Sequence, residues 1–409
     1  MTKEGEPRMT DRDDEQVTRI LAPQSTAQRV SRRLFIQGGA VALFSGSVLL
    51  AACSSDSDSN PSAGGAPTGS TGTGEIEDQL NFYHWAEYDD PKLFKEFTDE
   101  FGATTKIDIY ASNEEMIAKL NAAQGTAGYD IVVPTGVYIP QMVQLGLLAE
   151  LDLANIPNFK NIETQYTNQP WDPDNLHSVC KDWGSTGWIW DTEAIDGDIT
   201  TWNDFIAAAQ GPASGKTSVL DAPNDLCGIY FWANGIDWTT EDQADLDACQ
   251  DFIVNDLAPH IKAFDSYPGI ALTQGNYVLS QAWNGDARQG LIQTEDKDPG
   301  RYKWGLGAPK TELWMDNWCI LAEAENVNAA YAWINFILQP EVSLKDLEFH
   351  GYNTGIKGVQ EQAEAANLPY LDVVFFDEAQ VATFEAGAVN SATETTVKIW
   401  DEAKAKAGT

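Results

Sequence analysis

Residues 80–102 read LNFYHWAEYDDPKLFKEFTDEFG, and this stretch predicts a strand followed directly by a helix. The first six residues form an apolar and aromatic run that is typical of a strand. Asp90 stands where it can cap a helix that begins at Pro91, and Gly102 stands where such a helix ends. The apolar residues of that helix fall on one face, namely Leu93, Phe94, Phe97 and Phe101.

The same alternation of strand and helix continues along the chain. We predict a second strand at residues 106–110, a helix opened by a capping box at residues 112–115, and a third strand at residues 131–133. The third strand is wholly apolar, as is typical of a buried parallel sheet. A second region of this kind begins near residues 188–190 and ends with a helix at residues 393–407. The pattern predicts an α/β fold in which helices cover the faces of parallel sheets.

Length and charge narrow the classes of function. With 409 residues the chain is long enough for two α/β lobes, and a crevice between lobes is where such folds bind ligands. It contains 62 Asp and Glu against 25 Lys and Arg, a net charge of −37. A chain this acidic repels phosphate, so nucleic acid and anionic membrane surfaces are poor partners for the folded body. The charge permits a cationic ligand, but the solubility of an exported protein explains it equally well.

The N-terminus has the pattern of an export signal. Arg32 and Arg33 form a twin-arginine pattern, and the apolar run that follows ends in Leu-Ala-Ala-Cys at residues 50–53. This ending resembles a bacterial lipobox, in which the cysteine carries the lipid. We therefore predict a signal peptide at residues 1–52 and lipid attachment at Cys53. The alternative is a retained transmembrane helix.

Residues 53–75 are rich in Ser, Asp, Gly, Thr and Pro, which predicts a flexible tether. A lipid on Cys53 followed by this tether would hold the body at the cell membrane without a transmembrane span. We expect an extracytoplasmic protein that is exported by the twin-arginine route and touches the membrane through its lipid anchor alone.

Cysteines and histidines give weak signals. The body has four cysteines, which are Cys180, Cys227, Cys249 and Cys319. They can form two disulfides in any of three pairings, or they can be buried free thiols. The four histidines lack metal-ligand spacing. Asp172 opens a stretch like a calcium loop, but Trp183 occupies the twelfth position, where the loop needs Glu. We expect no metal site and no cofactor.

Eight short motifs carry a resemblance to a known family. They are HWAEY at 84–88, SNEEM at 112–116, YDIVVP at 129–134, DAPNDL at 221–226, AWNGD at 282–286, LWMDN at 313–317, INFILQPEV at 334–342 and GYNT at 351–354. The chain resembles the bacterial polyamine (spermidine/putrescine) periplasmic binding proteins, which capture substrate for ABC importers. YDIVVP and INFILQPEV occur across many solute-binding proteins and support the fold alone. HWAEY, AWNGD and LWMD are closer to the polyamine branch and indicate the ligand.

The resemblance implies a type II periplasmic-binding-protein clamshell with two discontinuous lobes. Lobe one would comprise residues 76–185 and 315–360, and lobe two residues 186–314 and 361–409. The protein would be a monomer that captures a polyamine and delivers it to the membrane subunits of an ABC permease.

The motifs also imply a set of binding residues. A polyamine needs carboxylates at its ammonium groups and flat apolar walls along its methylenes, and aromatic walls add cation–π attraction. The aromatic wall positions fall on Trp85, Tyr88, Trp283, Trp314 and Tyr352. The carboxylate positions fall on Asp225, Asp286 and Asp316, and a hydroxyl position falls on Thr135. Glu87 and Asp221 are weaker candidates, since either can be an ordinary solvated side chain.

Several of these residues have an alternative interpretation. Trp85 and Trp283 end apolar strands and can be core residues. Asp316 lies between bulky apolar stretches, where either a cationic ligand or a structural Lys or Arg explains a carboxylate. We expect it to be solvated in an open crevice when ligand is absent. Asp225 lies beside a helix start and can be an N-cap. Val137 stands where the family often has an aromatic residue.

Two other classes of function, a secreted enzyme and a binding protein for another solute, are alternatives. Aspartate pairs and Trp-lined clefts also suit a secreted glycosidase, but no G-x-S-x-G motif and no Cys with an obvious His partner is present, so we expect no enzyme. A binding protein for a sugar would want more amide side chains among its walls. One for an amino acid would need Arg, and the body has Arg288 and Arg301 alone.

Overall fold

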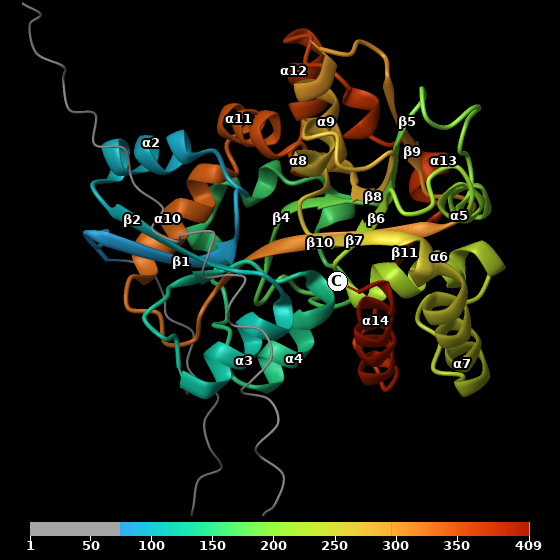
Figure 1. Ribbon diagram of the computed structural model, residues 1–409. Helices are drawn as coiled ribbons and strands as arrows, with labels where there is room; N and C mark the ends of the chain where they lie inside the picture. The colour runs from blue at the N-terminus through green and yellow to red at the C-terminus, as the bar shows by residue number, and fades with distance from the viewer. Residues whose placement is uncertain (1–73, 124, 296, 409) are drawn as a thin grey trace, which may run out of the picture. The chain divides into compact units, whose positions relative to one another are not determined.

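The computed structural model describes residues 74–123, 125–295 and 297–408 (Figure 1). The predicted signal peptide, its twin-arginine pair and the predicted lipid attachment at Cys53 lie outside these residues, as does nearly all of the predicted tether. Among the helices of the described ranges, none has the length and apolar character needed to cross a membrane.

The first sheet has six strands in the order β11-β10-β3-β1-β2, with β4 also paired to β10. Its strands are β1 (Gln79–Trp85), β2 (Thr104–Tyr110), β3 (Ile131–Val132), β4 (Val179–Gly184), β10 (Thr311–Ile320) and β11 (Phe384–Ala386). β1 runs parallel to β2 and β3, as expected for βαβ units. β10 runs antiparallel to β3 and β4. The chain leaves the first sheet after β4 and returns to it at β10, so neither strand belongs to a βαβ unit. The predicted parallel pairing is therefore confirmed for β1, β2 and β3, whereas the first sheet as a whole is mixed.

The second sheet has five strands in the order β7-β6-β8-β5-β9. They are β5 (Thr186–Asp191), β6 (Thr217–Leu220), β7 (Ile261–Asp265), β8 (Leu279–Trp283) and β9 (Tyr302–Leu306). This sheet is also mixed: β6 is parallel to β7 and β8, whereas β5 is antiparallel to β8 and β9. The chain passes from one sheet to the other at Ser185, between β4 and β5, and returns between β9 and β10.

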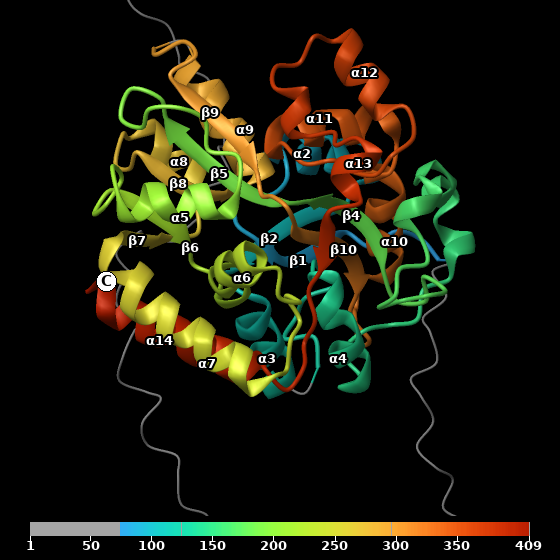
Figure 2. The ribbon, with the colours of Figure 1, turned by 90° about the vertical axis from the view of Figure 1, so that its right-hand side faces the viewer.

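Helices cover both faces of each sheet, as the sequence predicts. Around the first sheet, α2 (Pro91–Phe101) and α10 (Val327–Ile337) lie on one side, and α3 (Asn113–Ala123) and α4 (Ile139–Gln144) lie on the other (Figure 1). Around the second, α8 (Pro268–Thr273) and α9 (Asn284–Glu295) lie on the side opposite α6 (Pro223–Asn234), α7 (Gln243–Asp251) and α14 (Thr393–Ala407) (Figures 1 and 2). The remaining α-helices are α5 (Trp202–Gln210), α11 (Pro340–His350), α12 (Val359–Ala365) and α13 (Glu378–Val381).

Local signals set the helix ends. The Asp90 side chain accepts a hydrogen bond from the backbone N–H of Lys92, and Gly102 closes α2 with a φ of 82°, so the predicted helix is confirmed. At α3 the Ser112 hydroxyl accepts the N–H of Glu115 at 3.1 Å. The Glu115 carboxylate, however, accepts the N–H of Ala111 at 3.0 Å, so the reciprocal bond of the predicted capping box is shifted by one residue.

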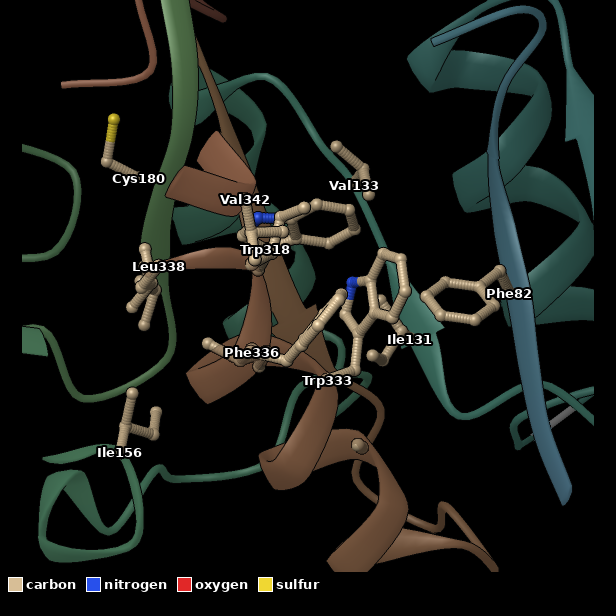
Figure 3. Close-up of a cluster of buried hydrophobic side chains, with 14 of the residues drawn as sticks. Phe82, Ile131, Val133, Ile156, Cys180, Trp318, Trp333, Phe336, Leu338 and Val342 are labelled. Atoms are coloured by element: carbon tan, nitrogen blue, oxygen red, sulfur yellow. The ribbon is translucent and has the colours of Figure 1, made fainter. Parts of the chain in front are cut away.

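Aromatic rings form much of the core between α10 and the first sheet. Trp333 of α10 packs edge-to-face with Phe82 of β1 at a centroid distance of 5.0 Å and lies beside Trp318 and Phe336 (Figure 3). The Trp333 ring also stacks on Phe94 of α2 at 4.8 Å. Since truncating a buried Trp costs about 3–5 kcal/mol, this cluster fixes the helix on the sheet that carries the site.

The four described cysteines are free and buried. Cys249 and Cys227 lie close to one another, with the Cys249 Sγ 3.9 Å from the Cys227 carbonyl oxygen. Burial raises the pKa of the Cys180 and Cys319 thiols well above the usual range. Of the two interpretations left open by the sequence, the structure favours free thiols over disulfides.

Candidate ligand-binding site

Asp316 of β10 lies at the centre of a group of predicted site residues. Its carboxylate accepts hydrogen bonds from the Thr135 hydroxyl at 2.7 Å and the Tyr88 hydroxyl at 2.8 Å. It is only 5% exposed, so the expectation of a solvated side chain is wrong. Burial, together with the charge of Asp182, raises the pKa of Asp316 to about 7. Among the described residues it forms no ion pair, which removes the interpretation of Asp316 as the partner of a structural Lys or Arg.

Asp182 of β4 lies directly across the antiparallel ladder from Asp316. Like charges at opposed positions destabilise a strand pair. The Tyr88 hydroxyl bridges the two carboxyl groups, at 2.5 Å from Asp182 Oδ1 and 2.8 Å from Asp316 Oδ2. A hydroxyl has a single proton to donate. It can therefore satisfy both contacts only when one of the carboxyl groups is itself protonated.

Lys181 offsets the charge of Asp182 from behind the site. Its Nζ lies 2.8 Å from Asp182, 3.4 Å from Asp89 and 3.8 Å from Asp346. The same Nζ lies 3.8 Å from the centroid of the Tyr88 ring. Burial alone would lower the pKa of Lys181, but the three carboxylates outweigh it and raise that pKa. His350 adds a further contact to this cluster, because its Nε2 lies 3.2 Å from Asp346 and 3.6 Å from Asp182.

A second acidic pair comprises Asp225 of α6 and Glu312 of β10. The Thr186 hydroxyl lies 2.9 Å from Asp225 Oδ1 and 2.8 Å from Glu312 Oε2. Burial raises the pKa of Asp225, and hydrogen bonds from Glu312, Thr186 and Trp283 only partly offset it. Ala222 is the N-cap of α6, and Asp225 lies in its first turn, so the N-cap interpretation of Asp225 is wrong.

Asp286 joins the group through Tyr352. The Tyr352 hydroxyl donates to Asp286 Oδ2 at 2.6 Å, and burial raises the pKa of Asp286 to about 6. The Tyr352 ring packs edge-to-face on Trp314 at 4.8 Å and on Tyr88 at 6.1 Å. This approach needs Gly285, because a Cβ there would lie 2.4 Å from the Tyr352 ring.

Trp85 and Trp283 stand at the last positions of β1 and β8, and both are partly buried. The Trp85 indole N–H donates to the Val133 carbonyl at 3.0 Å, and its ring packs edge-to-face on Tyr110 at 4.6 Å. Trp85 therefore belongs in part to the core. Trp283 contacts Asp225 and packs against the core of the first sheet, although it belongs to the second. The carboxyl ends of strands are the usual edge for ligands in α/β folds.

Comparisons with known proteins identify the family of the chain. Residues 92–373 match the family model of the bacterial extracellular solute-binding proteins. The chain belongs to this family. It is 33% identical over 283 residues to the spermidine/putrescine-binding periplasmic protein of Salmonella typhimurium, covering 68% of this chain and 77% of the relative.

Solved structures establish the fold of this solute-binding protein. The spermidine/putrescine ABC transporter substrate-binding protein PotD of Streptococcus pneumoniae superimposes with a TM-score of 0.68 at 26% identity, covering 81% of this chain and all of the other. The Tp0655 (TpPotD) lipoprotein of Treponema pallidum gives a TM-score of 0.69 at 24% identity, covering 80% and 99%. The predicted two-lobe, type II periplasmic-binding-protein fold is confirmed.

Glu87 and Asp221, the two weaker candidates for binding residues of this solute-binding protein, lie in different places. Glu87 is exposed with a φ of 53°, and its charge contributes to the raised pKa of Asp286, after burial and the charge of Asp265. Asp221 accepts hydrogen bonds from Trp400 at 2.9 Å and Lys404 at 2.6 Å, both on α14. The structure therefore places Asp221 apart from the other candidates, in a contact that holds α14.

Sequence reasoning missed Asp182, Lys181, Thr186 and Glu312. Glu312 immediately precedes the LWMDN motif and alternates with Trp314 and Asp316 along β10, so period-two spacing was its available signal. Asp182 had no comparable signal, because its place depends on the register between β4 and β10.

Tyr138 follows Val137, the position at which an aromatic residue was expected. The Tyr138 hydroxyl donates to Glu114 at 2.6 Å, and burial together with the charges of Glu114, Glu312 and Asp225 raises its pKa. Tyr138 is thus close enough to the second acidic pair for their charges to affect it. Within the ranges that the structure describes, no group of three or more His, Cys, Asp or Glu side chains is arranged to hold a metal ion.

Proposed function

We propose that this solute-binding protein captures a polyamine, spermidine or putrescine, between its two lobes and delivers it to the membrane subunits of an ABC importer. The observation that carries the proposal is the set of buried carboxyl groups beside aromatic rings. Asp316, Asp225 and Asp286 have hydroxyl partners, but none of them forms an ion pair with a cation of the described residues. Burying carboxylates in this way is costly unless a positive charge joins them.

A polyamine supplies the missing charges. Its ammonium groups would form charge-assisted hydrogen bonds with the carboxylates, and its methylenes would lie on Trp314, Tyr352 and Trp283. The relatives support this ligand, since the Salmonella protein is a spermidine/putrescine-binding protein by name. A polyamine has no bond for these residues to cleave, and we propose binding without catalysis.

The lobes and the anchor are part of the same proposal. We assign residues 76–185 and 315–360 to one lobe, and residues 186–314 and 361–409 to the other. Cys53 would carry a lipid after twin-arginine export, and residues 53–75 would tether a monomeric body outside the cytoplasm. The twin-arginine and lipobox patterns support this part of the proposal.

A calorimetric titration of residues 53–409 tests the ligand class. We expect saturable binding of putrescine or spermidine and no binding of arabinose or arginine under the same conditions. Binding of arabinose alone would favour a sugar-binding protein, and binding of arginine alone an amino-acid-binding protein. Either result would contradict the proposal.

A further inference from the structure

The second acidic pair contains a residue that no binding motif of the chain includes. Glu312, Trp314 and Asp316 stand at alternate positions of β10 and therefore share one face of that strand. Glu312 is thus aligned with a predicted aromatic wall and a predicted carboxylate. It is partly exposed, whereas its partner Asp225 is only 5% exposed.

Proton counting shows how this pair is held together. The Thr186 hydroxyl lies within hydrogen-bond distance of both carboxyl groups but has one proton to donate. Two ionised carboxylates would leave one of these contacts without a hydrogen and would repel each other. Neither Asp225 nor Glu312 has a basic partner among the described residues. One carboxyl group of the pair must therefore carry a proton.

We propose that Glu312 is a further ligand-binding residue, which shares a proton with Asp225 in the unliganded protein and exchanges it for an ammonium group of the ligand. This inference rests on the proposed function. On binding, the carboxyl O–H bond breaks, the proton passes to the buffer, and the ammonium N–H groups donate to both carboxylates. The charge of the pair then changes from one negative charge to two, opposite the incoming cation.

The surrounding groups agree with a proton held at this pair. Burial and the neighbouring Asp225 raise the pKa of Glu312 well above its usual range, and Asp316 on the same strand adds to the effect. Burial and the charges of Glu114, Glu312 and Asp225 raise the pKa of Tyr138, which is neutral at pH 7. On the adjacent strand, Glu385 is the register partner of Glu312, and its carboxylate is ion-paired with Lys310. None of these groups supplies a positive charge to the pair.

Proton release on binding tests the inference. The measurement is calorimetric titration with spermidine at pH 7 in phosphate and in Tris, two buffers that differ strongly in ionisation enthalpy. For the native chain we expect a binding enthalpy that depends on the buffer, and an affinity that rises with pH, because binding favours the deprotonated pair. Glu312→Gln should release about one proton fewer and bind at least about tenfold more weakly.

Glu150→Gln is the matched control, since Glu150 is exposed and lies outside the site, and it should behave like the native chain. Equal proton release and equal affinity in Glu312→Gln and the native chain would overturn the inference while leaving polyamine binding intact. A native chain that binds no polyamine would instead overturn the proposed function. If Glu312→Gln does not fold, the native chain still decides the matter: a pH-independent affinity and a buffer-independent enthalpy contradict the exchange.

Discussion

The substitution Asp316→Asn distinguishes a ligand-binding role of the Asp316 carboxylate from a structural one. The asparagine side chain keeps the shape of Asp316 but cannot ionise. In the folded protein the pKa of Asp316 is raised from 3.8 to about 7, mainly by burial. At about 1.36 kcal/mol for each pKa unit, ionisation of Asp316 destabilises the unliganded protein by roughly 4 kcal/mol above pH 7.

The sign of the effect follows from the raised pKa. Between about pH 4 and pH 7 the folded protein holds a proton that the unfolded chain has lost, so stability due to this group falls as pH rises through that window. Asp316→Asn lacks this fall. We therefore expect the variant to be at least as stable as the native chain without ligand, with an advantage that grows from pH 5 to pH 8. The Tyr88 hydroxyl can still donate to Asp182, so it keeps an acceptor in the variant.

Ligand affinity should change in the opposite direction. Removing one partner of a buried charge pair typically costs about 2–5 kcal/mol, which corresponds to a loss of roughly 30- to several-thousand-fold. The assays are calorimetric titration with putrescine and spermidine at pH 7.5, and thermal unfolding without ligand at pH 5 and pH 8. Asp256→Asn, at an exposed position, is the control and should change neither quantity. Native affinity in Asp316→Asn, or a loss of stability without ligand at pH 8, would refute the reasoning.

Three further changes test other parts of the account. Replacing Cys53 by Ser should release the body from the membrane fraction of cells that express it, because the predicted lipid attachment is lost; membrane association at the native level would contradict the lipobox prediction. Spermidine should reduce the radius of gyration in small-angle scattering, since a site built from two lobes binds better when closed, and an unchanged profile at saturation would count against closure. Gly285→Ala places a Cβ where it would lie 2.4 Å from the Tyr352 ring, so we expect a stability loss of about 1–3 kcal/mol by denaturant unfolding together with weaker polyamine binding. A Gly285→Ala variant with native stability and affinity would contradict the conclusion that the Tyr352 ring needs glycine at position 285.

Local signals in the sequence were enough to predict most elements near the site. The ends of α2 follow from Asp90, Pro91 and Gly102, because each acts on backbone groups within a few residues of itself. The final helix, α14, also begins and ends where its pattern predicts, at Thr393 and Ala407.

The pairing of strands that are distant in sequence could not be predicted from local sequence patterns. The antiparallel course of β10 depends on β3 and β4, which are distant in sequence, so strand–helix alternation alone suggested a parallel sheet. The same register places Asp182 opposite Asp316, and no local pattern reports that contact. The free thiols were undecided for a similar reason, since cysteine spacing does not fix the distances between sulfur atoms.

For the candidate site, too, local motifs predicted the residue types, whereas the contacts between them depend on the fold. The motifs located the residue types, and the structure joins Thr135, Asp316, Tyr88, Tyr352 and Asp286 in one chain of contacts. Whether a carboxylate is solvated or buried depends on the packing of neighbouring side chains, and for Asp316 the expectation of a solvated side chain was wrong. Asp221 illustrates the opposite case, since its partners are on α14 at the far end of the chain.

A crystal structure of residues 53–409 with bound spermidine would test the central claim most directly. We predict one ammonium nitrogen within hydrogen-bond distance of the Asp316 carboxylate, another at Asp225 and Glu312, and the methylenes against Trp314 and Trp283. A ligand that lies elsewhere, or that contacts none of these carboxylates, would contradict the account.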